Sequence, residues 1–429
     1  MLPCRFSALS RSHGTSIRFP KVVGALLRHP LQTRSRALNM ATPTASASDG
    51  RPSSSSLPIS AASVPAGNAC AKMEVGEGAS ASVKGVQEGR DVFRPRFVDI
   101  GINLTDPIYR GAYHGTQRHR DDLSDVVKRA VDVGCEVLIV TGSDLEHSKQ
   151  ALVLARDYRT VYATIGVHPC NAETLNPSVM QQLQDLAALA KKDGSVVAFG
   201  EIGLDYDRLE LCPKNTQLQA FEQQLRLAVQ LQLPLFLHSR AAHADFIRIL
   251  SEFEDRLPRR GVVHSFTGTL EEMQDLAARG WDIGVNGCSL KTEENLAVVK
   301  EIPLERLHLE TDGPWCEMRP SHASSAILKK MRTGIDKGAK KGEEDPSMGW
   351  GSWMSVKKEK WIEGAVVKGR NEPCFIGRVA WAVAGVKGLS VEEVARAAWT
   401  NSCRVFGVGG DGDGDGDGDE DRQGDRLLK

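Results

Sequence analysis

Four side chains of the types that bind metal ions each close a short apolar run: Glu201 in AFGEIGLDY, His238 in PLFLHSR, His264 in GVVHSF and Asp312 in LHLETDGPW. Two imidazoles and two carboxylates offer nitrogen and oxygen donors, which suit zinc, manganese, iron or cobalt, and also magnesium when waters complete its shell. Taken singly, each residue has an ordinary alternative role, such as a hydrogen-bonded histidine or a turn-forming aspartate. Their recurrence at the same place in four runs favours one shared metal site.

Such a site predicts hydrolysis by an activated water. A bound cation lowers the pKa of water, and Asp312 is the carboxylate expected to hold that water or take its proton. If the substrate is a phosphodiester, its oxygens need a further positive charge, and Arg240, two residues beyond His238, is the candidate. The predicted catalytic residues are therefore Glu201, Asp312 and Arg240, and the predicted metal ligands are Glu201, His238, His264 and Asp312.

The runs that end in these residues belong to a regular alternation. Short β-type runs lie near residues 98, 136, 161, 196, 234, 261, 281 and 306, separated by stretches with apolar residues at helical spacing. The helical stretches span residues 121–133, 145–158, 177–192, 216–231, 242–253, 270–279 and 293–302. Eight β/α units predict an α/β fold of the (β/α)₈ or TIM-barrel type, with the metal site of a hydrolase. A doubly wound open sheet is the alternative, but no Gly-rich phosphate fingerprint follows the first run.

A barrel gathers the ends of its strands at one face, so polar residues after the other runs are candidates for the same site. Asn103 follows the first run, His168 the third and Asp205 the fourth. Tyr206 and Trp315 supply rings on which bases could stack, with packing at the rim as the alternative role. The predicted substrate contacts are Asn103, His168, Asp205, Tyr206, Trp315 and, from a later motif, Arg370.

The chain of 429 residues is longer than such a barrel requires, and its ends differ in composition from its middle. Residues 1–95 combine a basic segment, with seven Lys or Arg and no Asp or Glu in the first 48 residues, with a Ser/Ala/Pro tract over 41–67. This composition predicts a disordered extension that includes a candidate mitochondrial or plastid transit peptide, with Met40 as a candidate internal start. Residues 96–408 are the predicted barrel domain, and residues 409–429 a disordered, acidic Gly/Asp tail.

Within the barrel domain, residues 327–360 are predicted to be a basic inserted loop. Residues 329–360 hold nine Lys or Arg and five acidic residues among Gly, Ser and Trp. A solvated loop is the first interpretation of this charge and contact with a polyanion the second. Two further helices, over residues 375–384 and 390–406, are expected to pack against the outside of the barrel.

Charge and cysteine content limit the function classes. The formal net charge is −1, so the chain lacks the strongly basic character that is typical of many nucleic-acid-binding domains. Any contact with phosphate must therefore come from a local group of basic residues. Nine cysteines stand singly, with no C-x-x-C pair, which argues against a disulfide framework or a thiolate zinc site and favours a reducing compartment. No run reaches the roughly 18 apolar residues of a membrane span. A soluble intracellular protein of the cytosol or nucleus is expected, unless the basic N-terminus directs import.

Seven motifs, in order along the chain, together resemble one family. They are DIGINLTD from Asp99, TIGVHP from Thr164, GEIGLDY from Gly200, FLHSR from Phe236, VVHSFTG from Val262, LETDGPW from Leu309 and RNEPC from Arg370. This set resembles the TatD family of metal-dependent deoxyribonucleases. The segments PWCEMRPSHASS and KKEKW, followed by RNEPC, are similar to its eukaryotic branch in particular.

The resemblance implies a TIM-barrel hydrolase that degrades DNA, commonly from the 3′ end, supported by magnesium, with manganese or zinc as alternative ions. It places metal-ligand roles on Glu201, His238, His264 and Asp312. It also implies that Arg370 folds back near the barrel mouth, either to contact substrate or to pin a loop by salt bridges. Many wider relatives carry an H-x-H pair after the first strand, where this chain has Gly101 and Asn103, so one or two cations are expected.

The expected function is a metal-dependent deoxyribonuclease, a 3′–5′ exonuclease on single-stranded ends, in DNA repair or DNA degradation. Two other classes remain open. A metal-dependent amidohydrolase or esterase acting on a small molecule would use the same barrel and donors, and an interaction protein would keep the fold without turnover. The expected partner is DNA, with no membrane, and a monomer is favoured.

Overall fold

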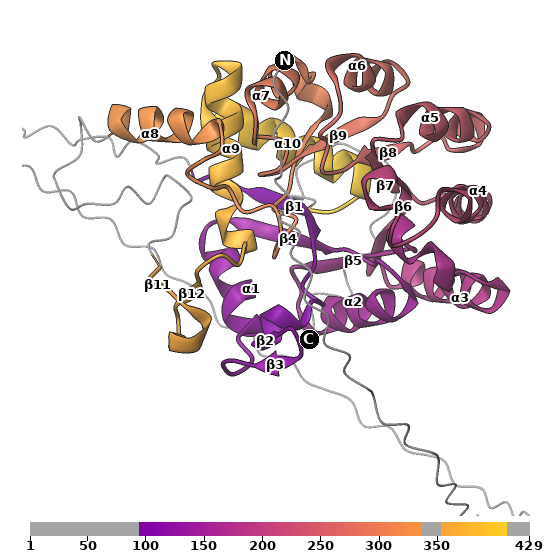
Figure 1. Ribbon diagram of the computed structural model, residues 1–429, viewed down its shortest axis with the longest axis horizontal. Helices are drawn as coiled ribbons and strands as arrows, with labels where there is room; N and C mark the ends of the chain where they lie inside the picture. Colours follow the sequence, from indigo (N-terminus) through magenta and orange to yellow (C-terminus); the bar gives the residue numbers. More distant parts are fainter. Residues whose placement is uncertain (1–93, 336–352, 410–429) are drawn as a thin grey trace, which may run out of the picture. The chain divides into compact units, whose positions relative to one another are not determined.

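Eight parallel strands form one sheet at the centre of the structure, a computed structural model that describes residues 94–335 and 353–409 (Figure 1). Each strand pairs with the next in the order β1-β4-β5-β6-β7-β8-β9-β10. Their bounds are β1 Phe97–Ile102, β4 Cys135–Val140, β5 Val161–Ile165, β6 Val196–Asp205, β7 Leu235–Arg240, β8 Gly261–Val263, β9 Asp282–Val285 and β10 Leu307–Leu309. Two small sheets stand apart, formed by β2 (Ala112–Tyr113) with β3 (Thr116–Gln117) and by β11 (Ser355–Val356) with β12 (Val366–Val367).

The first and last strands of the large sheet nearly complete a ring. The Asp312 amide donates to the Gly101 carbonyl over 2.8 Å, and the Asn103 amide donates to the Gly313 carbonyl over 2.9 Å, just beyond the end of β10. These bonds continue the pattern of a parallel pair, so the sheet becomes a nearly closed barrel. The (β/α)₈ prediction is confirmed, and the doubly wound alternative is wrong because it requires an open sheet.

Helices connect successive strands and cover the outside of the barrel (Figure 1). Their bounds are α1 Leu123–Asp132, α2 Leu145–Asp157, α3 Pro177–Lys192, α4 Lys214–Leu231, α5 His243–Ser251, α6 Leu270–Ala278 and α7 Glu293–Glu301. Polar side chains cap the starts of some of them: Asp144 caps α2 by accepting from the His147 amide, and Thr269 and Glu272 form a reciprocal capping box at α6. All seven lie where the apolar spacing predicted helices.

The inside of the barrel is filled by side chains near the starts of the strands. Ile100 and Phe236 belong to a buried cluster that also contains Phe406. The helices α9 (Ile376–Lys387) and α10 (Val391–Phe406) were both predicted to pack on the outside. α9 does so, against α7, whereas the end of α10 also closes the base of the barrel. Burying the apolar end of α10 there removes the strand starts from water.

The segment predicted to be an inserted loop begins with a helix. α8 spans Ser324–Ile335 and packs Ile327, Leu328 and Met331 against the hydrophobic core. These residues recur at helical spacing, a signal that the Lys and Arg content of the segment concealed, so the loop prediction is wrong for residues 327–335. The predictions for residues 336–352, for most of the N-terminal extension and for the Gly/Asp tail lie outside the described residues.

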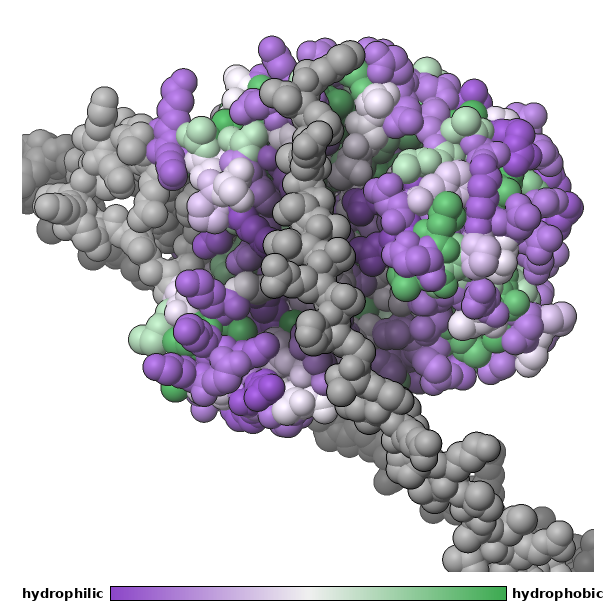
Figure 2. Space-filling model, viewed as in Figure 1, coloured by the Kyte–Doolittle hydropathy of each residue, from purple (hydrophilic) through white to green (hydrophobic). Residues whose placement is uncertain are grey.

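In residues 94–335 and 353–409, no single helix is both long and apolar enough to cross a membrane. One pair of helical segments, Pro373–Lys387 and Val391–Phe406, has the length and composition of a membrane span when taken together, but the two are bent by 114° where they meet. The face of the molecule seen in Figure 2 is mostly hydrophilic, and its apolar residues are scattered. Trp315, which is 58 % exposed, is the one strongly exposed apolar side chain of the described residues that lines the pocket at the carboxyl ends of the strands.

Candidate active site

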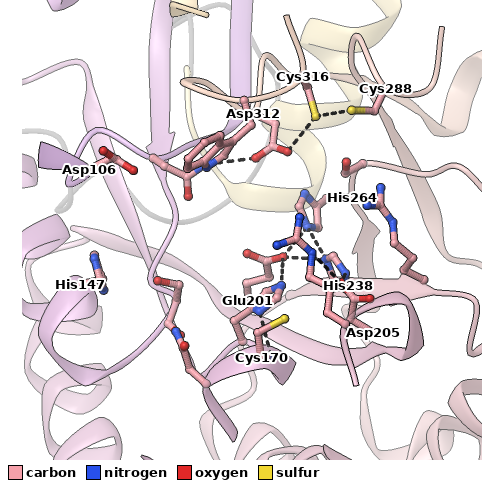
Figure 3. Close-up of a pocket in the computed structure, with 18 of the residues that line it drawn as sticks. Asp106, His147, Cys170, Glu201, Asp205, His238, His264, Cys288, Asp312 and Cys316 are labelled. Carbon is pink, nitrogen blue, oxygen red and sulfur yellow. Dashed lines mark hydrogen bonds and ion pairs between the residues drawn. The ribbon is translucent and has the colours of Figure 1, made fainter. Parts of the chain in front are cut away.

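A polar pocket lies at the carboxyl ends of the barrel strands (Figure 3). Its volume is about 470 Å³, within the range of small-molecule sites. Nine of the eleven predicted site residues line it: Asn103, His168, Glu201, Asp205, His238, Arg240, His264, Asp312 and Trp315. The barrel thus brings together residues that are spread over more than 200 positions of sequence, whereas Tyr206 and Arg370 lie outside the lining.

Glu201 is the centre of the site. Its Oε1 atom lies 2.8 Å from Nδ1 of His238 and 2.7 Å from Nε2 of His264, and these two nitrogens are 3.4 Å apart. Gly203 lets β6 approach β7, since a Cβ at this position would lie 1.8 Å from the His238 carbonyl oxygen. A carboxylate oxygen and two imidazole nitrogens directed at one spot form a donor set for a divalent cation.

Burial and charge act in opposite directions on this cluster. Burial alone would raise the pKa of Glu201, but the imidazoles of His168 and His264 hold it well below its usual value. Burial alone would lower the pKa of His264, but the charges of Glu201 and Glu310 raise it well above its usual value. The cluster therefore attracts positive charge, and protons and a divalent cation would compete for the same positions.

Each histidine of the cluster is held from behind by a second carboxylate. Asp205 accepts from Nε2 of His238 over 3.1 Å, and Glu310 accepts from Nδ1 of His264 over 3.3 Å. Glu310 is fully buried and also accepts from the Ser265 amide. Such carboxylate–histidine pairs fix the ring orientation and tautomer of metal ligands. They leave Nδ1 of His238 and Nε2 of His264 directed at the candidate cation position.

Asp312 lines the same pocket but lies outside the three-residue cluster, whose donor atoms are all within 4.8 Å of one another. Its Oδ1 accepts from Nδ2 of Asn103 over 3.1 Å, and its Oδ2 accepts from Sγ of Cys316 over 3.2 Å. Burial raises the pKa of Asp312 to about 6. Its φ of 52° is left-handed, a strained conformation for a residue other than glycine and one that is common at functional sites.

A segment far along the chain holds the Asp312 loop in place. Nδ2 of Asn371 donates to the carbonyl oxygens of Thr311 and Trp315, each over 2.8 Å. The Asn371 carbonyl in turn accepts from the Tyr109 hydroxyl over 2.7 Å. The two sides of the Asp312 turn are therefore clamped by one amide, which helps to maintain its strained conformation.

Arg370 and Tyr206 do not occupy the positions predicted for substrate contacts. Arg370 is 1 % exposed, and its guanidinium binds Asp122 at 2.7 Å and Glu372 at 2.8 Å. Because these partners enclose it, the geometry favours the alternative role, in which Arg370 pins the loop by salt bridges. The Tyr206 ring is already covered by the Lys214 ammonium, 4.6 Å from its centroid.

His168, Asp205 and His238 form a second group whose possible ligand atoms lie within 4.8 Å of one another, but the hydrogen bonds of His168 favour a donor role. Its Nδ1 accepts from the Cys170 amide over 3.0 Å, and its Nε2 lies 3.3 Å from Oε1 of Glu201. Burial lowers the pKa of His168 to about 4, so the ring is neutral near pH 7. A neutral ring whose Nδ1 accepts must carry its proton on Nε2, and that nitrogen then has no lone pair to offer.

Arg240 is suited to bind an anion. It follows His238 by two positions on β7, so both side chains leave the same face of the strand. Its guanidinium makes no hydrogen bond or ion pair with residues 94–335 or 353–409, and it lines the pocket. A phosphate that entered the pocket would therefore find an uncommitted guanidinium.

Some residues in or behind the pocket were not predicted. Glu310 lies in the last strand run, LHLETD, where a charged residue beside buried apolar ones was an available signal. Cys288 and Cys316 are 28 positions apart, and no sequence pattern joins them. His147 reaches the pocket from the start of α2, with its Nδ1 bonded to Asp144 over 2.8 Å.

Comparison with known proteins agrees with this geometry. Residues 98–407 match the family model described as TatD related DNase. The chain is 47 % identical over 317 residues to Deoxyribonuclease Tat-D of Schizosaccharomyces pombe, covering 72 % of this chain and 96 % of that protein. It is 40 % identical over 220 residues to the 3′-5′ ssDNA/RNA exonuclease TatD of Shigella flexneri, covering 51 % of this chain and 78 % of that protein. A solved structure, an uncharacterized amidohydrolase from Saccharomyces cerevisiae, matches with a TM-score of 0.64 at 38 % identity, covering 73 % of this chain and 100 % of that chain. With its barrel and its clustered donors, the chain belongs to the eukaryotic branch of the TatD-related deoxyribonuclease family.

Proposed function

We propose that this protein is a cation-dependent deoxyribonuclease that removes nucleotides from the 3′ end of single-stranded DNA, with magnesium as the cation. The observation that carries the proposal is the meeting of Glu201, His238 and His264 at the barrel mouth, with a second carboxylate behind each histidine. The name of the Shigella flexneri relative, a 3′-5′ ssDNA/RNA exonuclease, supports the polarity and the single-stranded substrate. Such an activity would serve DNA repair or DNA degradation.

The donor set fits a divalent cation. Imidazole and carboxylate donors suit zinc or manganese, and magnesium is accepted when waters complete its shell. When bound, the cation supplies a lowered pKa for the attacking water and positive charge for the phosphate oxygens. Glu201, His238 and His264 would hold it, while Asp205 and Glu310 would keep a lone pair of each ring directed at it. Asp312, which lines the same pocket, is the proposed fourth ligand.

Other pocket residues would move the proton and balance the phosphate charge. With a pKa of about 6, Asp312 is mostly ionised at neutral pH and is able to take a proton from the attacking water. Asn103 holds one of its oxygens in place by donating to Oδ1. Arg240 would pair with the non-bridging phosphate oxygens, and the Nε2 proton of His168 offers a second donor to developing negative charge.

The size and rim of the pocket favour a single strand. The cavity of about 470 Å³ is the size of a small-molecule site, which supports binding of the end of one strand rather than a paired duplex. Trp315 lines the rim and is 58 % exposed, so one face of its indole is available to stack on a base. Stacking of this kind tolerates any base, which is what an exonuclease requires.

The test is digestion of single-stranded DNA by the full chain with magnesium or manganese. A 5′-labelled linear strand, a strand of the same sequence with a blocked 3′ end and a single-stranded circle would be compared. The variants are Glu201→Ala, His264→Ala and, as a matched control, Glu136→Ala, which removes a carboxylate from a half-exposed ion pair with Arg96.

We expect a cation-dependent ladder that shortens from the 3′ end of the open strand, with the blocked strand and the circle resistant. Glu201→Ala and His264→Ala would lose this activity and Glu136→Ala would keep it. Cutting of the circle would contradict the exonuclease assignment. Inert DNA together with cation-dependent hydrolysis of amides or esters would favour the amidohydrolase alternative.

A further inference from the structure

Two cysteines meet in the wall of the pocket. The Sγ atoms of Cys288 and Cys316 lie 2.6 Å apart, and Figure 3 shows the sulfur of Cys316 between that of Cys288 and the carboxylate of Asp312. Cys288 stands three residues beyond β9 and Cys316 in the loop after β10, so two paired strands deliver the two loops. Both side chains are partly exposed and line the cavity, which gives small molecules access to them.

The backbone itself brings the two sulfurs together. The loops touch where Gly287 faces Cys316, since a Cβ on Gly287 would lie 2.0 Å from the Cys316 carbonyl oxygen. Oδ1 of Asn286 accepts from the Cys288 amide over 2.8 Å and holds the turn that carries Cys288. Because a disulfide needs its sulfurs about 2.05 Å apart, only a small movement separates this pair from a covalent bond.

The pair is linked directly to the proposed catalytic machinery. Sγ of Cys316 donates to Oδ2 of Asp312 over 3.2 Å, and Nδ2 of Asn103 donates to Oδ1 over 3.1 Å. Each oxygen of Asp312 is therefore held by one side-chain donor. A disulfide sulfur carries no proton, so bond formation between the cysteines would remove one of the two.

We propose that Cys288 and Cys316 form a redox modification site, at which hydrogen peroxide closes a disulfide in the wall of the active site. One thiol, after losing its proton, attacks the peroxide and becomes a sulfenic acid, and a first water leaves. The other thiol then attacks that sulfur, which forms the S–S bond and releases a second water. The two sulfurs together lose two electrons, and the peroxide takes them up as it is reduced to water.

Location distinguishes this pair from the three buried cysteines of the described residues. Cys135, Cys212 and Cys374 are buried, so an oxidant dissolved in water does not reach them readily. Reversible pairs of this kind suit a reducing compartment, where disulfides are mostly transient and redox-sensing.

The functional consequence rests on the proposed nuclease activity. With its Cys316 donor lost, Asp312 is held through one oxygen only, so its carboxylate is less firmly positioned in the pocket. We expect the oxidised protein to cleave single-stranded DNA about fivefold more slowly, the factor that corresponds to one hydrogen bond of typical net strength. Reduction by a dithiol would restore the rate.

The test uses the full chain, fully reduced and then exposed to hydrogen peroxide. Peptide mapping without reduction would show whether the peptides of Cys288 and Cys316 become linked with loss of two hydrogen atoms. DNA cleavage would be measured before oxidation, after oxidation and after dithiothreitol. The variants are Cys288→Ser and Cys316→Ser, with Cys170→Ser as a matched control, because Cys170 also lines the pocket but is not part of the pair.

The expected result is a Cys288–Cys316 link in the wild type and in Cys170→Ser, with a dithiol-reversible loss of activity that neither Cys288→Ser nor Cys316→Ser shows. Absence of the link under conditions that oxidise Cys170 would overturn the proposal. So would a complete link that leaves the cleavage rate unchanged. Because the link is scored by mass, a protein without nuclease activity would still reveal whether the modification site exists, and the two proposals fail separately.

Discussion

Replacing Glu310 by glutamine tests how the site holds His264. The change keeps the shape of the side chain and removes one charge and one acceptor from a fully buried position. Oε1 of Glu310 accepts from the Ser265 amide and from Nδ2 of Asn286, and Oε2 accepts from Nδ1 of His264. The substituted glutamine side chain must therefore place one oxygen and one NH₂ group among three donors.

The two donors at Oε1 decide the orientation of the new amide. If its NH₂ group faced Ser265 and Asn286, the buried Ser265 amide would lose its acceptor and Nδ2 of Asn286 would keep only its bond to Ser265 Oγ, so the amide oxygen should remain there. The NH₂ group then faces Nδ1 of His264, which becomes an acceptor only if the ring carries its proton on Nε2. Nε2 is the nitrogen directed at Glu201 and at the candidate cation position. A proton on Nε2 would remove the lone pair with which His264 binds the cation.

The magnitude follows from the cost of the alternatives. Keeping His264 as a ligand would leave its Nδ1 proton opposite an NH₂ group or leave the Ser265 amide without its acceptor, and each buried unsatisfied group costs about 1–3 kcal/mol. Loss of a partner behind a metal ligand typically lowers metal affinity by about 10–100-fold. We therefore expect Glu310→Gln to bind manganese or magnesium about 10–100-fold more weakly.

Calorimetric titration of the full chain with manganese would measure this affinity directly, without a DNA substrate. Circular dichroism would confirm that the variant is folded. Glu136→Gln is the matched control, because it removes the same charge from a half-exposed ion pair with Arg96. A folded Glu310→Gln protein that binds manganese as tightly as wild type would refute the assignment of Nε2 of His264 to the cation.

Three further outcomes are expected. Arg370→Met removes one of the two arginines that face the buried carboxylates of Asp122 and Glu372 and leaves only the other, Arg129, beside them, so urea unfolding should show a loss of about 3 kcal/mol, the low end for a broken buried ion pair, while KM of the folded enzyme is unchanged. A raised KM in a stable protein would restore the substrate-contact role. Trp315→Ala should raise KM for single-stranded DNA about tenfold or more and leave kcat and stability unaltered, and an unchanged KM would exclude base stacking there. Cation affinity should rise with pH above 6.5, because the cation displaces protons from His238 and His264, whose pKa values are raised by their carboxylate partners against the effect of burial. Calorimetric titration in buffers of different ionisation heat would count the released protons. Binding that does not depend on pH would contradict the assigned ligands.

Local patterns were sufficient for the architecture. The strand and helix periods each span few residues, so they could be read directly from the sequence. Eight successive β/α units then favoured a barrel over an open sheet. The same patterns failed where two influences competed. In α8 the charge of the segment concealed the apolar spacing of Ile327 and Met331, and the end of α10 packs under the barrel for reasons of burial that its own residues do not reveal.

The candidate ligands were visible because strand ends converge on one face of a barrel. Glu201, His238 and His264 could be selected from their positions in the runs alone, and the structure places their donor atoms within 4.8 Å of one another. The sequence could not show that Asp312 lies apart from them, held by Asn103 and Cys316, since that depends on side-chain orientation within the pocket.

By itself, then, the sequence determined the barrel, the family motifs and the identity of the donor residues, because each depends on residue type and on spacing along the chain. Tertiary structure alone decided which other residues contact or surround those donors. It placed Glu310 behind His264, enclosed Arg370 in salt bridges and brought Cys288 against Cys316. These relations join residues from different strands and loops, and their distances are set by packing, which no local period records.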